Sequence, residues 1–112
     1  MSKRDWKILF DDILESIDKI NLYTKDIDFE KFISNSMIID AVVRNIEIIG
    51  EASSKIPEEI KNNFSEIPWI KLKGIRNRIV HDYFGVDVNI IWEIIKKDLT
   101  ELKKQIEHAL MN

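Results

Sequence analysis

The stretch RNRIVHDYF, at positions 76–84, carries side chains that are able to do chemistry. Two arginines, a histidine, an aspartate and a tyrosine are interleaved there with apolar residues. Histidine titrates near neutrality without special help, so His81 is the natural proton donor or acceptor of the group. The stretch is therefore either an acid–base site or the charged end of a helix.

A run of positive charge surrounds this stretch. Between Pro68 and Val80 the charged residues are Lys71, Lys73, Arg76 and Arg78, and none is acidic. Cations near a helix C-terminus complement its dipole, and Arg78 with Asp82 makes an ordinary surface pair one turn apart. The other interpretation is a phosphate-binding face. From charge alone the first interpretation is preferred.

Helical geometry separates the chemical groups of the stretch. Arg76 and Tyr83 lie on nearly the same face, and the Asn77 amide, one turn from His81, can orient the imidazole. Arg76 and His81 are about 140° apart around an ideal helix. They converge only if the helix loosens before Gly85, if the long arginine reaches round, or if a second copy of the chain supplies one of them.

A second polar cluster precedes the basic run. Glu47 and Glu51 are one helical turn apart and are able to form a polar site with Arg44. The simpler interpretation is a solvated or interhelical ion-pair face, and it is slightly preferred.

Other catalytic templates are missing from the sequence. His81 and His108 do not have the spacing of metal ligands, so we expect no metal. There is no glycine-rich phosphate loop and no recognisable Ser–His–Asp order.

The composition suits one soluble globular domain, predicted to span 1–112. The chain has 112 residues, 45% apolar and 33% charged. It has no cysteine, which fits a reducing cytosol. No signal-peptide h-region or membrane-length apolar run is present. The net charge of −3 argues against a uniformly basic nucleic-acid-binding surface but allows a local basic patch.

Apolar spacing is helical throughout, and it predicts an all-α fold. One apolar stripe ends near Leu22 and comprises Trp6, Leu9, Phe10, Ile13, Ile17 and Ile20. A second stripe, on 36–55, comprises Met37, Ile38, Ala41, Val42, Ile46, Ile49 and Ala52. A third stripe comprises Ile91, Ile95, Leu99, Leu102, Ile106 and Leu110. The second stripe is the widest, so its helix is expected in the middle of a bundle. Gly50 within it costs roughly 1 kcal/mol against Ala, which a close approach to a neighbouring helix would compensate.

Local signals mark the helix ends. Asp28 caps a short helix near 29–34, and Asp87 or Asn89 caps the last helix. Pro57 and Pro68 suit the first turns of two others, and Gly85 suits a C-terminal left-handed position after the basic helix. The apolar stripes and the helix-end signals together predict an antiparallel four-helix bundle with one or two short extra helices.

Two stretches of the sequence resemble a known family. Residues 76–83, RNRIVHDY, match the RxxxxHxY motif of the HEPN superfamily, including the polar residue after the arginine. Residues 44–52, RNIEIIGEA, resemble the second signature of one HEPN branch, the HepT toxins, and IPWIKLKGIRNRIVHDYFGVD resembles that branch across its length. Together, in this order and in a helical chain of this length, the two motifs are a specific match.

The resemblance implies a HEPN-like bundle that forms a homodimer with two motifs at one cleft. It also implies a metal-independent endoribonuclease without a cofactor. His81 would be the general acid–base residue and Arg76 would stabilise charge on the cleaved phosphate. Asn77 and Asp82 would support them, and Lys71, Lys73 and Arg78 would bind RNA phosphates. The product would carry a 2′,3′-cyclic phosphate.

The resemblance also implies a partner. HepT toxins are usually encoded beside a minimal nucleotidyltransferase, MntA, which uses ATP to transfer AMP to the motif tyrosine. Tyr83 stands at that position. Added nucleotide would bring negative charge and bulk to the cleft and switch it off. The alternatives are a non-catalytic subunit that binds nucleotide or substrate for a nucleotidyltransferase, and a helical interaction module without chemistry.

Overall fold

The computed structural model describes residues 5–81 and 87–111, and of residues 78–81 it describes the backbone alone. The described part is helical and contains no strand, which confirms the all-α prediction. The elements are α1 (Trp6–Tyr23), α2 (Phe29–Ile33), α3 (Ser36–Ser54), α4 (Glu58–Asn63), α5 (Trp69–His81), α6 (Val88–Glu93), a π-helical turn η2 (Ile94–Asp98) and α7 (Leu99–Met111).

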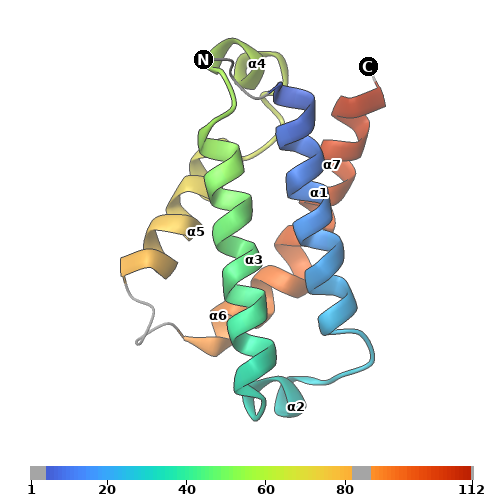
Figure 1. Cartoon of the computed structure of the whole chain (residues 1–112), viewed down its shortest axis with the longest axis vertical. Helices are drawn as coiled ribbons and strands as arrows, with labels where there is room; N and C mark the ends of the chain where they lie inside the picture. The colour runs from blue at the N-terminus through green and yellow to red at the C-terminus, as the bar shows by residue number, and fades with distance from the viewer. Residues whose placement is uncertain (1–4, 82–86, 112) are drawn as a thin grey trace.

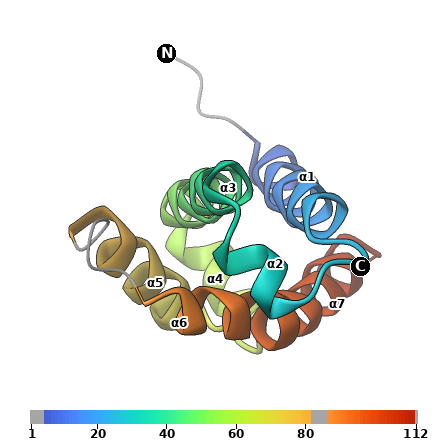
Figure 2. The ribbon, with the colours of Figure 1, turned by 90° about the horizontal axis from the view of Figure 1, so that it is seen from below.

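The long helices form an up-and-down bundle (Figure 1). α1, α3, α5 and the α6–η2–α7 run alternate in direction, with α4 at one end of the bundle and α2 at the other. Seen end-on, α3 lies between α1 and α5, and it packs against both (Figure 2). The expected central position of this helix is therefore confirmed.

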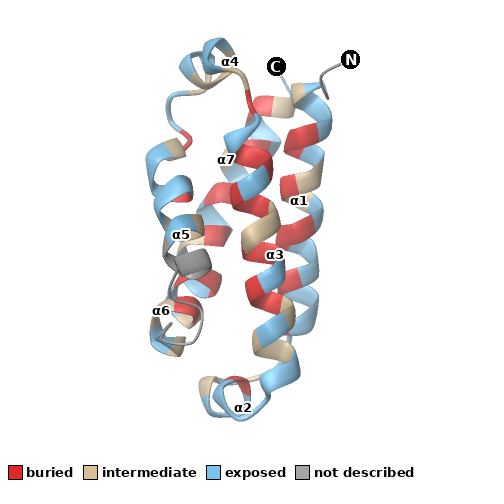
Figure 3. Cartoon of the chain, turned by 60° about the vertical axis from the view of Figure 1, so that its left-hand side comes forward, coloured by how far each residue is buried: buried red, intermediate tan, exposed pale blue. Residues whose placement is uncertain are grey.

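The predicted stripes form one core, whose buried faces turn inward (Figure 3). Most of the apolar residues expected inside are buried, among them Phe10, Ile13 and Ile17 of α1, which are fully inaccessible. Met37 was wrongly expected there, because it lies in the first turn of α3 at the end of the bundle and is 81% exposed. None of the described helices has the length and apolarity needed to cross a bilayer.

Capping residues and prolines mark where the helices begin. The Asp28 carboxylate accepts a hydrogen bond from the Lys31 amide at 2.8 Å, and the Asp87 carboxylate caps α6. The prolines sit one position earlier than expected, since Pro57 is the N-cap residue of α4 and Pro68 immediately precedes α5. Gly85 lies outside the described residues, so its expected role is not tested.

The last helix is interrupted where the sequence predicted continuity. A π-helical turn, Ile94–Asp98, inserts an extra residue between α6 and α7. This change of register lets the neighbouring side chains of Ile94 and Ile95 both face the core, where they are 6% and 3% exposed. At the far end of this run, Lys103 forms an ion pair with Asp18 of α1 at 2.9 Å. The hydrogen bond and charge of Asp18 raise the pKa of Lys103.

Candidate active site

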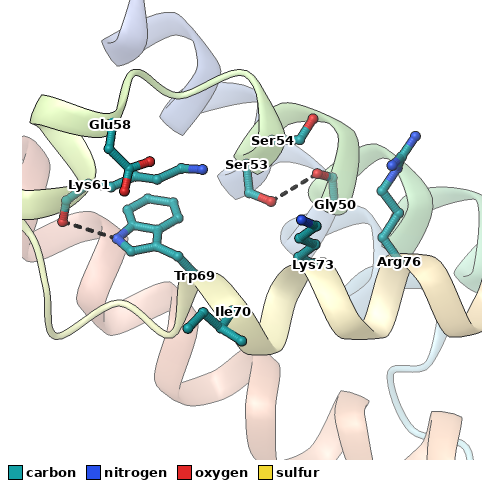
Figure 4. A pocket seen from close by; sticks show the side chains of 9 residues that line it. All are labelled: Gly50, Ser53, Ser54, Glu58, Lys61, Trp69, Ile70, Lys73 and Arg76. Carbon is teal, nitrogen blue, oxygen red and sulfur yellow. Dashed lines mark hydrogen bonds between the residues drawn. The ribbon is translucent and has the colours of Figure 1, made fainter.

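Arg76 lies at the closest approach of α3 and α5, directly against Gly50 (Figure 4). A Cβ atom added at Gly50 would stand 2.4 Å from the Arg76 Cβ and 2.8 Å from its Cγ. No side chain fits there without moving the helices apart. The expected close approach at Gly50 is therefore confirmed, and the neighbour it admits is the arginine of the basic stretch.

The guanidinium of Arg76 is held by Glu51 of α3, the helix that also carries Gly50. Its Nη2 donates to the Glu51 carboxylate, with an N–O distance of 2.8 Å. Glu51 is also 3.8 Å from the Lys55 ammonium, one turn further along α3. The Arg76 and Glu51 side chains are 35% and 48% exposed, so solvent screens their attraction. The contact therefore sets the direction of the guanidinium more than it adds stability.

In the polar cluster predicted on α3, Glu51 has different surroundings from Arg44 and Glu47. Glu51 makes an interhelical ion pair, and its described partners are Arg76 and Lys55. Arg44, two turns before Glu51, is exposed, and Glu47, one turn before it, is half-buried. The sequence missed the pairing of Glu51 with Arg76, although the glycine beside it marked this part of α3 for close contact with another helix.

The basic run of α5 does not form a single face. Lys73 and Arg76 line one groove with α3, whereas the Lys71 ammonium points to the other side and binds the Asp98 carboxylate of η2 at 2.8 Å. The side chain of Arg78 lies outside the described part. Of the cations predicted to bind phosphate, Lys73 is thus the one that the described structure places beside Arg76.

His81 is the last residue of α5, and its backbone alone is described. Asn77, one turn earlier, is exposed. Asp82 and Tyr83 lie outside the described residues, so no contact of the acid–base or tyrosine positions is tested. Because α5 is α-helical through 69–81, nothing in its described backbone removes the separation of about 140° between positions 76 and 81.

One outward stripe of α5 connects these positions to the exposed side chain of Ile70. Ile70, Gly74 and Asn77 follow each other at helical spacing and are all exposed, Ile70 by 89%. A Cβ atom added at Gly74 would meet nothing within 4 Å. By the same spacing, position 81 continues this stripe.

The comparisons with known proteins agree on one family. The family model described as "Ribonuclease HepT-like" matches residues 13–109. The chain is 47% identical to "Putative RNase MJ1380" of Methanocaldococcus jannaschii, covering 96% of this chain and 98% of that protein. It is 42% identical to "Probable ribonuclease HepT" of Thermococcus cleftensis, covering 94% and 96%.

A third relative comes from another organism. "Putative RNase TTE0752" of Caldanaerobacter subterraneus subsp. tengcongensis is 40% identical, over 88% of both chains. No solved structure matches the chain. Taken with the helical bundle and the packing of the two signatures at Gly50 and Arg76, these matches show that the chain belongs to the HepT-like ribonuclease family.

Proposed function

We propose that the protein is a metal-independent endoribonuclease that cleaves RNA with Arg76 and His81. The observation that carries the proposal is the setting of Arg76, which packs on Gly50 and is directed by Glu51. An arginine with several N–H donors, held at the edge of a groove, is suited to stabilise the charge that develops on a phosphate. The ribonuclease names of the relatives support RNA as the substrate.

The proposed reaction is an internal phosphoryl transfer. The ribose 2′-oxygen attacks the neighbouring phosphorus and its proton passes to a neutral His81 imidazole. The bond to the leaving 5′-oxygen breaks as that oxygen receives a proton from a protonated His81 imidazole. The products are a 2′,3′-cyclic phosphate and a free 5′-hydroxyl. No metal takes part in this scheme, because the imidazole moves the protons and the guanidinium stabilises the charge.

A cleavage assay in excess EDTA tests the proposal. We expect the parent protein to cut RNA there, and His81→Ala and Arg76→Ala to lower the rate at least 100-fold while keeping the fold, as is usual for losing an acid–base or charge-stabilising group. Lys19→Ala, on the far side of α1, serves as the control and should cut like the parent. If the parent itself cuts no RNA, the non-catalytic nucleotide- or substrate-binding subunit is the better description. If the parent and His81→Ala cut at the same rate, His81 is not the acid–base residue.

We propose further that the active form is a homodimer paired through the outward stripe of α5. Ile70 is 89% exposed, and among the described residues no neighbour lies within 4 Å of a Cβ atom added at Gly74, so none accounts for a glycine in mid-helix. A second copy on this stripe would bring two Asn77–His81 turns together.

Ile70→Glu is expected to dissociate this dimer by burying a charge in an apolar contact. Analytical ultracentrifugation checks the change, and the oligomeric state alone decides, because Ile70 also lines the groove beside Arg76 and a carboxylate there would disturb RNA binding directly. Met37→Glu is the matched control, because Met37 is 81% exposed at another end of the bundle. A dimer that survives Ile70→Glu intact contradicts the assignment to α5.

The regulatory part of the proposal concerns Tyr83. We propose that the protein is the toxin of a toxin–antitoxin pair and that an MntA-like nucleotidyltransferase adds AMP to this tyrosine from ATP. Intact mass and peptide mapping after incubation with the transferase and ATP should locate the AMP on Tyr83, and the modified protein should no longer cut RNA. Tyr83→Phe should stay unmodified and active. Inhibition of the Phe variant to the same extent would show that the antitoxin acts by masking instead.

A further inference from the structure

A groove about 260 Å³ in volume runs from Arg76 along α5 to Trp69, between α3 and α4 (Figure 4). Lys73 lies between these two residues, so an aromatic ring, an ammonium and a guanidinium follow one another on successive turns of α5. Arg76 at one end is the proposed phosphate-stabilising residue. The groove is therefore continuous with the proposed cleavage site.

The charge of the groove favours an anionic ligand. Lys61, Lys73 and Arg76 line it, against the lining carboxylate of Glu58 and the Glu51 carboxylate that is paired with Arg76. This local excess of cations occurs in a chain whose net charge is −3. Lys73 and Arg76 are one helical turn apart, about 4.5 Å along α5, so their long side chains are able to hold two neighbouring phosphates of one strand.

The indole of Trp69 is a rigid surface at the far end of the groove. Its Nε1 donates to the carbonyl oxygens of Lys61 and Phe64, at 3.3 and 3.2 Å. Its rings pack against Phe10, with centroids 5.9 Å apart. The ring is thus fixed before any ligand arrives. Tryptophan surfaces of this kind stack on the flat face of an unpaired base.

The remaining lining groups also suit a nucleotide. The Ser53 and Ser54 hydroxyls donate to carbonyls of their own helix, at 2.9 and 2.7 Å, which leaves their oxygens as acceptors for base N–H groups. The Lys61 ammonium stands 5.8 Å from the centre of the Trp69 ring. A stacked base would take that place, and the flexible lysine would turn to the adjoining phosphate.

We propose that this groove is a binding subsite for one unpaired nucleotide of the RNA, next to the cleaved phosphate. The base stacks on Trp69, and Lys73 holds the phosphate that follows the one at Arg76. The proposal rests on the proposed ribonuclease function for the identity of its ligand. It predicts a preference for RNA that is single-stranded on one side of the cut.

Binding of a 2′-O-methylated single-stranded hexanucleotide, which cannot be cleaved, tests the subsite without depending on catalysis. Trp69→Leu and Lys73→Glu are each expected to weaken its binding about tenfold, since each removes a stacked base or a phosphate contact. Lys96→Glu, an exposed cation on η2, carries the same charge change away from the groove and should bind within about threefold of the parent. The same strand closed into a duplex should bind more weakly than the open strand.

Trp69→Phe separates stacking from structure. Phenylalanine keeps an aromatic face but loses the two hydrogen bonds that tie the indole to α4, so we expect it to unfold more easily than the parent yet to bind within about threefold. If Phe and Leu lose affinity equally, Trp69 is structural and the subsite is refuted. Should Trp69→Leu fail to fold, Lys73→Glu against Lys96→Glu decides, and equal binding of the two refutes the subsite.

Cleavage by the same variants distinguishes the two proposals. A parent protein that binds the hexanucleotide through Trp69 and Lys73 but cuts no RNA keeps the subsite and refutes the ribonuclease mechanism. A parent that cuts RNA with rates and affinities unchanged by Trp69→Leu and Lys73→Glu keeps the mechanism and refutes the subsite.

Discussion

At the scale of single residues, two glycines of this chain have opposite surroundings. Gly50 is buried against the stem of Arg76, and Gly74 faces open space. Glycine in mid-helix costs roughly 1 kcal/mol relative to Ala in either place. At Gly50 that cost is offset by the close packing of α3 on α5. The same packing fixes the position of the Arg76 Cβ and Cγ atoms.

Substituting the two glycines by alanine should therefore give opposite results. Gly50→Ala forces α3 and α5 apart, and we expect it to lower the free energy of unfolding by about 1–3 kcal/mol, the usual cost of overpacking, and to reduce RNA cleavage by displacing Arg76. Gly74→Ala should raise stability by about 0.5–1 kcal/mol. Urea unfolding at a concentration where the chain is monomeric measures both. Equal stabilities would mean that the contact at Gly50 is not tight in solution.

At the scale of elements, the contact between α3 and α5 combines the two signatures of the chain. The Glu51 carboxylate of one helix and the Arg76 guanidinium of the other are 2.8 Å apart in a half-exposed setting. A pair so exposed contributes at most about 1 kcal/mol to folding. Its main effect is to hold the guanidinium in one orientation, with its other N–H groups available to a phosphate.

Removing this carboxylate should affect cleavage more than stability. For Glu51→Ala we expect roughly a tenfold lower kcat, a loss of unfolding free energy under about 1 kcal/mol, and partial rescue by Glu51→Gln, whose amide oxygen still accepts the hydrogen bond. Glu15→Ala is the control, because it removes a surface pair with Lys19 within α1. Cleavage by Glu51→Ala at the parent rate would show that Arg76 needs no partner to act.

At the scale of the whole molecule, the proposed function requires an acidic chain to bind a polyanion through a small cationic surface. The net charge is −3, and the groove beside Arg76 gathers three cations among its lining residues. The Lys71 ammonium faces away from this groove and already binds Asp98. Binding should therefore use few phosphate contacts for each chain.

The salt dependence of RNA binding measures the number of phosphate contacts that each chain makes. On a single strand, each neutralised phosphate contributes about −0.7 to the slope of log K against the logarithm of the salt concentration, where K is the association constant. With three cations we expect a slope of about −2. Fluorescence anisotropy with the methylated hexanucleotide at several salt concentrations measures it. A slope steeper than about −5 would require a much larger basic surface than this groove.

The sequence by itself determined the features that depend on near neighbours along the chain. Helical periodicity predicted the stripes of α1, α3 and the last helix, and short-range side-chain contacts predicted the caps at Asp28 and Asp87. Such features need only local spacing, and so did the two signatures that pointed to the family. The sequence did not predict the exposure of Met37 or the π-helical turn, because both depend on where a helix lies in the bundle.

Only the tertiary structure decided which distant residues meet. The packing of Gly50 on Arg76, the turn of Glu51 toward the guanidinium and the separation of Lys71 from Lys73 all depend on the register between α3, α5 and the π-helical turn. The groove from Arg76 to Trp69 depends on it too. Helical spacing predicts which face a side chain occupies, but the neighbour it meets there is set by how whole helices pack.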